Sequence, residues 1–292
     1  MKIENAVVYK MSADNAPVAR VESGTILTFV TRDCFNNQLQ ADDAVLDALD
    51  WDAINPATRP VYIEGAMPGD ILKVSILEIQ PASCGTMAAI PENGVLGSIV
   101  QNSVLKKLPV QDGMIEFSPN IRLPCTPMIG VIGVAPAAGA VPCGEPGSHG
   151  GNMDNTKIAS GATLYLPVFH AGALLAMGDV HACMGDGEIM VTGVEIPAEI
   201  TVRAEVLKGR SIRNPRLENA EACYTIASDE DLEKAIFAAV QDMTEVVMEQ
   251  LGMSLEEAGM LLSAAGSLQF CQVVDPKRTV RMEIKKSLLK GF

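Results

Sequence analysis

The stretch EIMVTGVEIPAEITVRAEVLKG, Glu188 to Gly209, carries the clearest fold signal in the chain. In its second half, from Ile200 to Val206, four apolar residues alternate with three polar ones. A period of two places the apolar side chains on one face of an extended chain. The stretch therefore predicts a β-strand with one buried face.

Similar segments recur upstream, separated by turns rich in Gly and Pro. GDILKVSILEIQP, residues 69–81, alternates in the same way, and TLYLPVF, residues 163–169, is apolar with a proline inside it. Because proline cannot donate to a strand ladder, the second segment is predicted to be an edge strand or a bulge. Short strands at this spacing predict a mainly β fold with a β-sandwich or barrel-like N-terminal part.

The pattern changes after Ser228. Apolar residues recur at intervals of three and four from Leu232 to Leu251, which predicts a helix with one buried face. Ser254 and Glu257 have the spacing of a capping box for a second helix, and two strand-like segments follow. We therefore predict two parts: a mainly β domain at 1–207, in which the candidate site residues described below lie, and a smaller α+β part at 208–292 that packs on it as scaffold.

Composition limits the classes of partner. The 292 residues have a formal net charge of -14, which opposes binding to a phosphate backbone. No apolar run reaches the length of a membrane span, and the N-terminus lacks the pattern of a secretory signal. The seven cysteines include no C-x-x-C pair. These features predict a cytoplasmic protein with reduced thiols and with neither a nucleic-acid nor a membrane partner.

The stretch GDVHACMGDGEI, residues 178–189, contains the first candidate site. On a strand, Asp179 and His181 would leave the same face, as two ligands of one metal or as a histidine ligand with a supporting carboxylate. The glycines that flank Asp186 predict a tight turn that could return Glu188 to the same place as a general base. A polar hairpin without any site is the alternative.

Two more segments supply candidate residues. PGSHGGNMDN contains paired glycines, whose backbone amides can approach a ligand closely, although an ordinary loop would use the same residue types. In TRDCF, Asp33 ends a strand-like run and could be a third metal ligand. Its neighbour Cys34 fits a buried inert thiol better than a nucleophile, since no basic residue adjoins it. The candidates in the glycine segment are His149, Gly150, Gly151, Asn152 and Asp154.

At these residues the sequence resembles the acetamidase/formamidase family. The matching segments run in family order from about residue 25 to residue 284, and the most specific are HGGNMD, GDVHACMGDGE and CQVVDPKRTVRMEI. The resemblance implies a mostly β fold, a homo-oligomer, a bound zinc or calcium ion, and hydrolysis of short aliphatic amides. The positions that match the family pattern are Asp33, His149, Asp154, Asp179, His181, Asp186 and Glu188.

The resemblance leads to a specific hypothesis about mechanism. A divalent metal, zinc with calcium as the alternative, would be held by His149, His181 and one or two of Asp33, Asp179 and Asp154. Glu188 would move the proton, assisted by Asp154 and Asp186, while Gly150, Gly151 and Asn152 would bind the amide substrate. A non-catalytic protein that binds a metal or small ligand, and a hydrolase of lactams or larger amides, remain alternatives.

Overall fold

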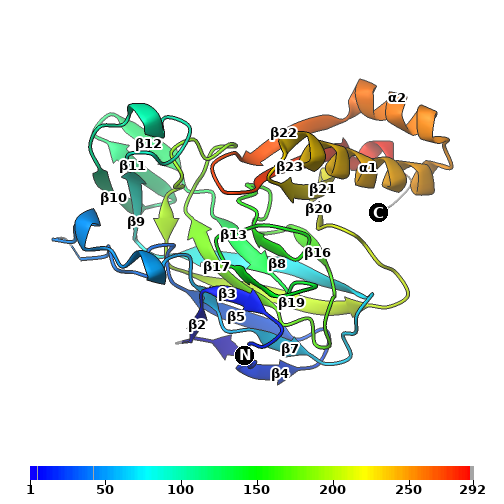
Figure 1. The fold of residues 1–292 in the computed structure, drawn as a ribbon, viewed down its shortest axis with the longest axis horizontal. Coiled ribbons are helices and arrows are strands. Elements are labelled where there is room, and N and C mark those ends of the chain that lie inside the picture. The colour runs from blue at the N-terminus through cyan, green and yellow to red at the C-terminus, as the bar shows by residue number, and fades with distance from the viewer. Residues whose placement is uncertain (5, 42, 290–292) are drawn as a thin grey trace.

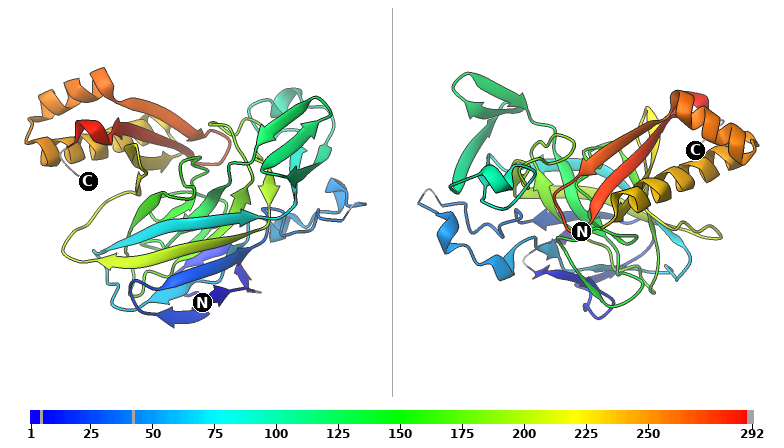
Figure 2. Two further views of the ribbon diagram at one scale, coloured as in Figure 1. Left: turned by 180° about the vertical axis from the view of Figure 1, so that it is seen from behind. Right: turned by 45° about the horizontal axis from the view of Figure 1, so that its top comes forward.

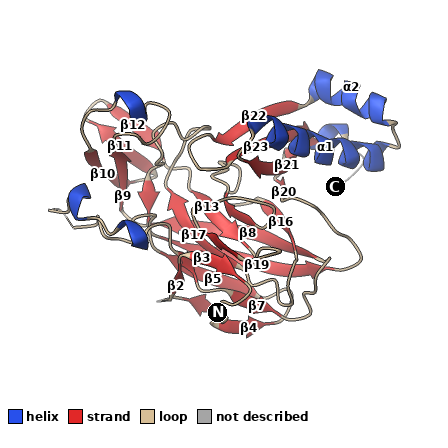
Figure 3. Ribbon diagram, in the orientation of Figure 1, coloured by secondary structure: helices blue, strands red, loops and turns tan. Residues whose placement is uncertain are grey.

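The structure, a computed structural model, describes residues 1–4, 6–41 and 43–289. Strands are its predominant regular structure, and two helices lie side by side near the C-terminal end (Figure 3). The prediction of a mainly β fold is therefore confirmed. Of the helices among the described residues, none combines the length and apolar character that crossing a bilayer requires.

The strand predicted from the opening stretch is β19, Ala198–Leu207, and it lies inside a nine-stranded sheet. Ile200, Val202 and Ala204 are fully buried, as the alternation predicts. The order across this sheet is β1 (Lys2–Ile3), β5 (Ile26–Thr31), β19, β8 (Ile71–Pro81), β16 (Thr163–Pro167), β20 (Arg216–Glu218), β21 (Ala222–Asp229), β23 (Arg278–Lys285) and β22 (Ser267–Gln272).

A second sheet of ten strands carries five of the ten candidate residues: Gly150, Gly151, Asn152, Asp179 and His181. Its inner strand β17, Ala176–His181, is buried along its whole length. The order is β12 (Ile121–Pro124), β11 (Met114–Ser118), β10 (Val104–Gln111), β9 (Cys84–Ala89), β18 (Glu195–Ile196), β17, β13 (Met128–Gly133) and β15 (Gly150–Asn152), with β6 (Ala57–Thr58) joining β17 to β2 (Val7–Val8).

Smaller elements complete the β part. Two short pairs are β3 (Lys10–Ser12) with β14 (Ala140–Pro142), and β4 (Ala19–Val21) with β7 (Val61–Ile63). Four short 3-10 helices are η1 (Leu46–Ala48), η2 (Trp51–Ala53), η3 (Gly97–Ile99) and η4 (Lys286–Leu288). In Figure 1 the first two lie beside β9, at the side of the molecule away from the C-terminal helices.

The segment TLYLPVF differs from its prediction. Its strand β16 lies between β8 and β20, so it is an inner strand and not an edge. The proline is tolerated because Pro167 is the last residue of the strand, where only β8 pairs with it. A missing amide donor therefore leaves no gap in the ladder.

One hydrophobic cluster joins the two large sheets. Its fully buried members include Phe29 of β5 and Val74 of β8 from the first sheet, and Ile129 of β13 and Val180 of β17 from the second. Because β17 belongs to this core, the residues near its end are held on a rigid support.

The C-terminal part extends the first sheet with the hairpin β22–β23 and covers it with two helices (Figures 1 and 2). Helix α1, Leu232–Leu251, ends at Gly252 in the left-handed conformation, with φ of 69°. Helix α2, Leu255–Ala265, begins with the predicted capping box of Ser254 and Glu257. Strands on both sides of the predicted boundary at residue 207 pair in one sheet, because β16 pairs with β20. The boundary itself stays a prediction.

Replacing Ser254 with Ala should lower the free energy of unfolding by about 1 kcal/mol, because the amide of Glu257 loses its side-chain acceptor. Urea unfolding followed by circular dichroism measures the change. A difference of zero within error would contradict the proposed contribution of the cap to stability.

Candidate active site

His181, the last residue of β17, lies at the centre of a buried group of carboxyl side chains. Its Nε2 atom is 3.1 Å from Glu195 Oε1 and 3.5 Å from Asp179 Oδ1. Asp154 Oδ1 and Glu188 Oε1 each lie 3.9 Å from the same nitrogen. One imidazole therefore faces four carboxyl groups that water barely reaches.

Strand geometry explains two of these contacts. Glu195 of β18 is directly opposite His181 in the antiparallel pair, so their side chains share a face. Asp179 precedes His181 by two residues and also faces it, but its backbone adopts the left-handed region with φ of 52°. That conformation costs about 1 kcal/mol for a residue with a Cβ. The surrounding sheet must therefore hold it in place.

Two glycines make room for the group. A Cβ on Gly130 of β13 would lie 2.6 Å from Asp179 Oδ2 and would also collide with Asp154 Oδ1. A Cβ on Gly193 would lie 2.6 Å from Cγ of His181. Only a residue without a side chain allows the carboxyl groups and the ring to approach as they do.

The turn at 185–188 brings Glu188 to the group. Gly187 has φ of 98° and Glu188 has φ of 48°, and the amide of Glu188 donates to the carbonyl of Gly185 at 3.2 Å. The amide of Gly187 donates at 2.8 Å to Cys271 of β22, which fastens the turn to the C-terminal hairpin. The sequence-based expectation that glycines return Glu188 toward His181 agrees with this geometry.

A cavity of about 240 Å³ opens onto the carboxyl group. Its buried floor is polar and includes Asp179, His181, Glu188 and Glu195. The lining also contains apolar residues, among them the half-exposed Trp51. The remaining residues around it are Cys34, Phe35, Ile54, Asn55, Ile90, Asn93, Asn152, Val191, Thr192, Val274, Asp275 and Pro276.

Burial and mutual repulsion make the group retain protons. Burial, followed by the charges of Glu188 and Asp179, raises the pKa of Asp154 well above its usual range. Burial raises the pKa of Glu188 well above its usual range, and that of Glu195 to about 7. Burial lowers the pKa of His181, but the charges of Glu195 and Asp179 outweigh this effect and raise it well above its ordinary value. Without a cation, the group therefore holds excess protons at neutral pH.

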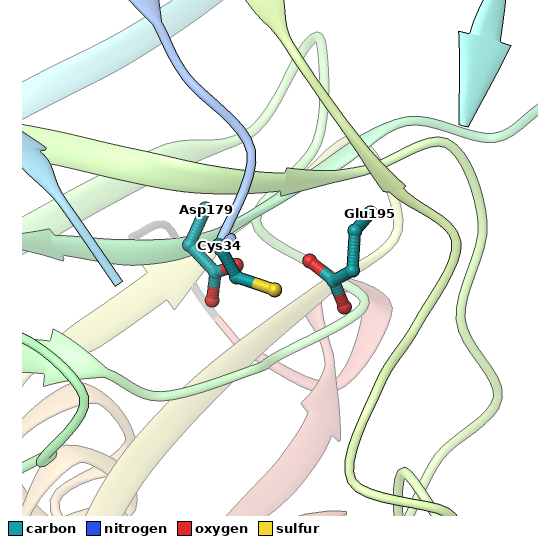
Figure 4. A group of neighbouring side chains, drawn as sticks. All are labelled: Cys34, Asp179 and Glu195. Carbon is teal, nitrogen blue, oxygen red and sulfur yellow. The ribbon is translucent and has the colours of Figure 1, made fainter. Parts of the chain in front are cut away.

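The donor atoms form two groups that could hold a metal ion. One consists of Asp154, His181 and Glu188, and the other of Cys34, Asp179 and Glu195, each with ligand atoms within 4.8 Å of one another. In Figure 4 the thiol of Cys34 points toward the carboxyl group of Glu195, with Asp179 beside it.

The unpaired atoms of the site also fit a cation. Both carboxyl oxygens of Asp154, Oδ1 of Asp179 and Oε2 of Glu195 are buried without a hydrogen-bond partner. Among the described residues, no Lys or Arg forms an ion pair with these groups within 4.0 Å. Buried carboxylates without a partner are costly, and a divalent cation with oxygen, nitrogen and sulfur ligands would compensate them.

The structure brings five of the residues predicted from sequence to this place: Asn152, Asp154, Asp179, His181 and Glu188. Asp33 does not line the cavity, because its Oδ1 accepts from the amide of Asn37 at 2.6 Å and its Oδ2 accepts from Gln40. Its neighbour Cys34 reaches the cavity instead. His149 also lies outside the lining; burial and the charge of Lys277 lower its pKa to about 4.

Three further predicted residues have other contacts. The Asp186 side chain is 42% exposed and forms an ion pair with Arg281. Gly150 and Gly151 of β15 do not line the cavity, and the Gly150 amide donates to the carbonyl of Gly147 at 3.0 Å. That amide is therefore not free to bind an oxyanion.

Two acidic residues of the site were missed from sequence. Glu195 interrupts the apolar run of Val194 and Ile196, a signal that becomes informative only when the opposite strand is known. Asp275 follows β22 and accepts from Asn152 Nδ2 at 3.0 Å. Burial raises its pKa to about 8, and the charge of Asp179 adds to this shift. The C-terminal part thus lines the cavity in addition to packing on the β part.

Comparisons with known proteins show relatives with a similar fold. A structure of a recombinant predicted acetamidase/formamidase from Thermoanaerobacter tengcongensis is 45% identical, with a TM-score of 0.96, and covers 98% of this chain and 96% of its own. An acetamidase structure from Bacillus halodurans is 41% identical, with a TM-score of 0.96 and 98% of both chains covered. A formamidase of Methylophilus methylotrophus is 24% identical over 264 residues, which are 68% of this chain and 64% of the relative. The chain spans 61–64% of the length of the curated relatives it matches.

The family model for acetamidases and formamidases matches residues 4–142 and 137–282, nearly the whole chain. The resemblance seen in the sequence motifs is thereby confirmed. This chain belongs to the Acetamidase/Formamidase family.

Proposed function

We propose that the protein hydrolyses a short aliphatic amide, such as formamide or acetamide, to a carboxylate and ammonia, and that the C–N bond is cleaved in the cavity at His181. The observation that carries the proposal is the group of four carboxyl side chains around one imidazole at the floor of a small cavity. The names of the related proteins, formamidase and acetamidase, support this substrate class.

The proposed cofactor is a divalent metal ion, zinc first and calcium as the alternative. Asp154 and His181 would hold it, with Cys34, Asp179 and Glu195 as adjacent donors and with Glu188 beside them for proton transfer. Such an ion supplies Lewis acidity, which makes water acidic enough to react near neutral pH and polarises a carbonyl group. Asp33 and His149, proposed as ligands from the sequence, lie outside these donor groups.

Glu188 is the proposed general base and acid. Its buried carboxyl group can take a proton from water and deliver it to the leaving nitrogen, because ammonia leaves only after protonation. Burial raises the pKa of this carboxyl group well above its usual range, so it holds a proton for the leaving nitrogen more readily than an exposed glutamate would. Asp186, which the sequence suggested as an assistant in proton transfer, has no role in this scheme, because its carboxylate forms an ion pair with Arg281.

Asn152 is the proposed contact for the substrate amide. Its Nδ2 donates to Asp275, while its Oδ1 is buried without a partner. A carboxamide oxygen is an acceptor for the N–H groups of an amide substrate. The apolar residues of the lining, which include Ile54, Ile90 and Val191, would receive the acyl carbons and exclude water.

The remaining parts of the proposal concern the oligomeric state, the location, the partners and the substrate. We keep a homo-oligomer and a cytoplasmic location as predictions from sequence, with no nucleic-acid or membrane partner. A lactam or a larger amide is the alternative substrate, and ammonia release across formamide, acetamide, propionamide and a lactam decides between them.

Replacing Glu188 with Gln should lower kcat for acetamide by about 10²–10⁴-fold, because the amide side chain cannot exchange the proton. Ammonia release measures the rate, and the exposed Glu199→Gln variant is the matched control. Activity retained in Glu188→Gln would remove Glu188 from the mechanism. A wild-type chain that releases no ammonia from any amide would favour the non-catalytic binding protein.

Replacing His181 with Gln should abolish metal retention and ammonia release together, because the imidazole is the central nitrogen donor of the site. His170→Gln is the control, since His170 Nε2 lies 2.9 Å from the carbonyl oxygen of Pro136 and the residue is not part of the cavity lining. Elemental analysis measures bound metal. Equal metal content in both variants would contradict the proposed ligand.

The stability of the metal-free chain should fall as pH rises. Folding raises the pKa of Glu195 to about 7 and that of Asp275 to about 8, so between their ordinary values and these values the folded chain binds more protons than the unfolded chain. The stabilisation is fully present below the ordinary values and is lost as pH rises through the raised ones.

Urea unfolding with a chelator present, at about pH 5 and about pH 9, tests this dependence. The free energy of unfolding should be lower at the higher pH, and added Zn²⁺ should remove most of the loss. A higher stability at about pH 9 without metal would show that the carboxyl groups do not repel one another as described.

A further inference from the structure

Arg281 is completely buried in β23, although arginine is almost never fully buried without partners. Its Nε donates to Gln269 Oε1 of β22 at 2.6 Å, which fixes the guanidinium plane within its own hairpin. Its Nη atoms reach loops distant in sequence, and Nη1 also donates to Cys271 Sγ of β22 at 3.8 Å. A charge buried in this way is retained only where the partners are well ordered.

The Nη atoms join two loops of the β part. Nη1 donates to Asn155 Oδ1 at 3.0 Å and to Thr156 Oγ1 at 3.3 Å, and Nη2 pairs with Asp186 Oδ2 at 2.5 Å. Thr156 Oγ1 also donates to Asp186 Oδ1 at 2.7 Å, so the two loops contact each other as well. One guanidinium thus holds residues 155–156 and residue 186 together.

Each loop carries one carboxyl group of the active site. Asp154 directly precedes Asn155, and Glu188 follows Asp186 by two residues. Both have left-handed backbones, with φ of 43° for Asp154 and 48° for Glu188. Residues with a Cβ keep this conformation only where the surroundings impose it. The contacts of Arg281 are next to both positions and can impose it.

We propose that Arg281 is a positioning residue for the active site, which sets the separation of Asp154 and Glu188 by clamping their two loops. The inference rests on the proposed function, because it assigns these two carboxyl groups to one metal and to proton transfer. Arg281 itself touches neither the cavity nor the metal donors. It acts through Asn155, Thr156 and Asp186.

The shape of the guanidinium explains why arginine is needed. Its planar fork donates in several fixed directions at once, whereas a lysine ammonium is a compact charge on a flexible stem. Lysine at this position would keep the positive charge near Asp186 but could not hold all the partners. Arg281→Lys therefore separates positioning from simple charge balance.

The test measures Arg281→Lys, Asp186→Asn and their double variant by three quantities: kcat and KM for acetamide, the dissociation constant for Zn²⁺ against a competing chelator, and circular dichroism. We expect kcat and Zn²⁺ affinity each to fall about 10–100-fold in Arg281→Lys, the range for groups that orient ligands, with KM changed far less. The double variant should be no worse than the more impaired single variant, because both substitutions break one contact.

Controls separate positioning from loss of fold. Arg20→Lys alters an exposed ion pair with Glu64 and should match the wild type. Thr156→Val removes contacts on both loops without leaving a buried charge unpaired, so it carries the test if Arg281→Lys does not fold. A folded Arg281→Lys with wild-type kcat and Zn²⁺ affinity would overturn the proposal, as would additive losses in the double variant.

Hydrogen exchange distinguishes this inference from the proposed function. If the wild type releases no ammonia, the proposed function fails by itself. The positioning role of Arg281 is then tested by the exchange rates of the Gly187 and Glu188 amides, which donate to the carbonyls of Cys271 and Gly185. Faster exchange of these amides in Arg281→Lys, with the α1 amides unchanged, supports the clamp, and unchanged exchange overturns it.

Discussion

The site depends on one electrostatic constraint: several buried carboxyl groups share a single imidazole. His181 faces four of them. Asp275, which accepts a hydrogen bond from Asn152, adds a fifth. Ionised carboxylates this close repel one another, and burial removes the water that would screen them. The group must therefore hold protons or a cation. This requirement links the shape of the fold to the proposed chemistry.

The fold meets the constraint by placing the site where rigid and irregular segments meet. Strand β17 presents His181 from the shared core, while Asp154, Asp179 and Glu188 sit on left-handed backbones that need external support. Gly130 leaves the volume that two of the carboxyl groups occupy. The hairpin β22–β23 closes the site by pairing with the turn before Glu188. The C-terminal part is thus both a support for the β part and a wall of the cavity.

Sequence reasoning succeeded where the relevant interaction is local. The alternation around Ile200 predicts β19, the spacing of Asp179 and His181 places both on one side of β17, and the glycines of the 185–187 turn return Glu188. It failed where the partner is distant in sequence. Glu195 becomes part of the site only through the register of β18 with β17.

The same reason explains the other differences. Asp186 has the local appearance of a catalytic residue, but Arg281 reaches it from 95 positions away. The carboxylate of Asp33 accepts hydrogen bonds from Asn37 and Gln40. These contacts depend on the conformation of the turn after Asp33, which the residue types alone do not predict. The family motifs indicate the region of the candidate site, whereas the choice among neighbouring carboxylates requires three-dimensional geometry.

The most direct test of the central claim is a crystal structure of protein purified without chelator, with anomalous scattering recorded at the zinc edge. We expect an anomalous peak about 2.0–2.2 Å from Nε2 of His181 and from a carboxyl oxygen of Asp154. A site that contains only water, with the same carboxyl groups still unpaired at neutral pH, would contradict it.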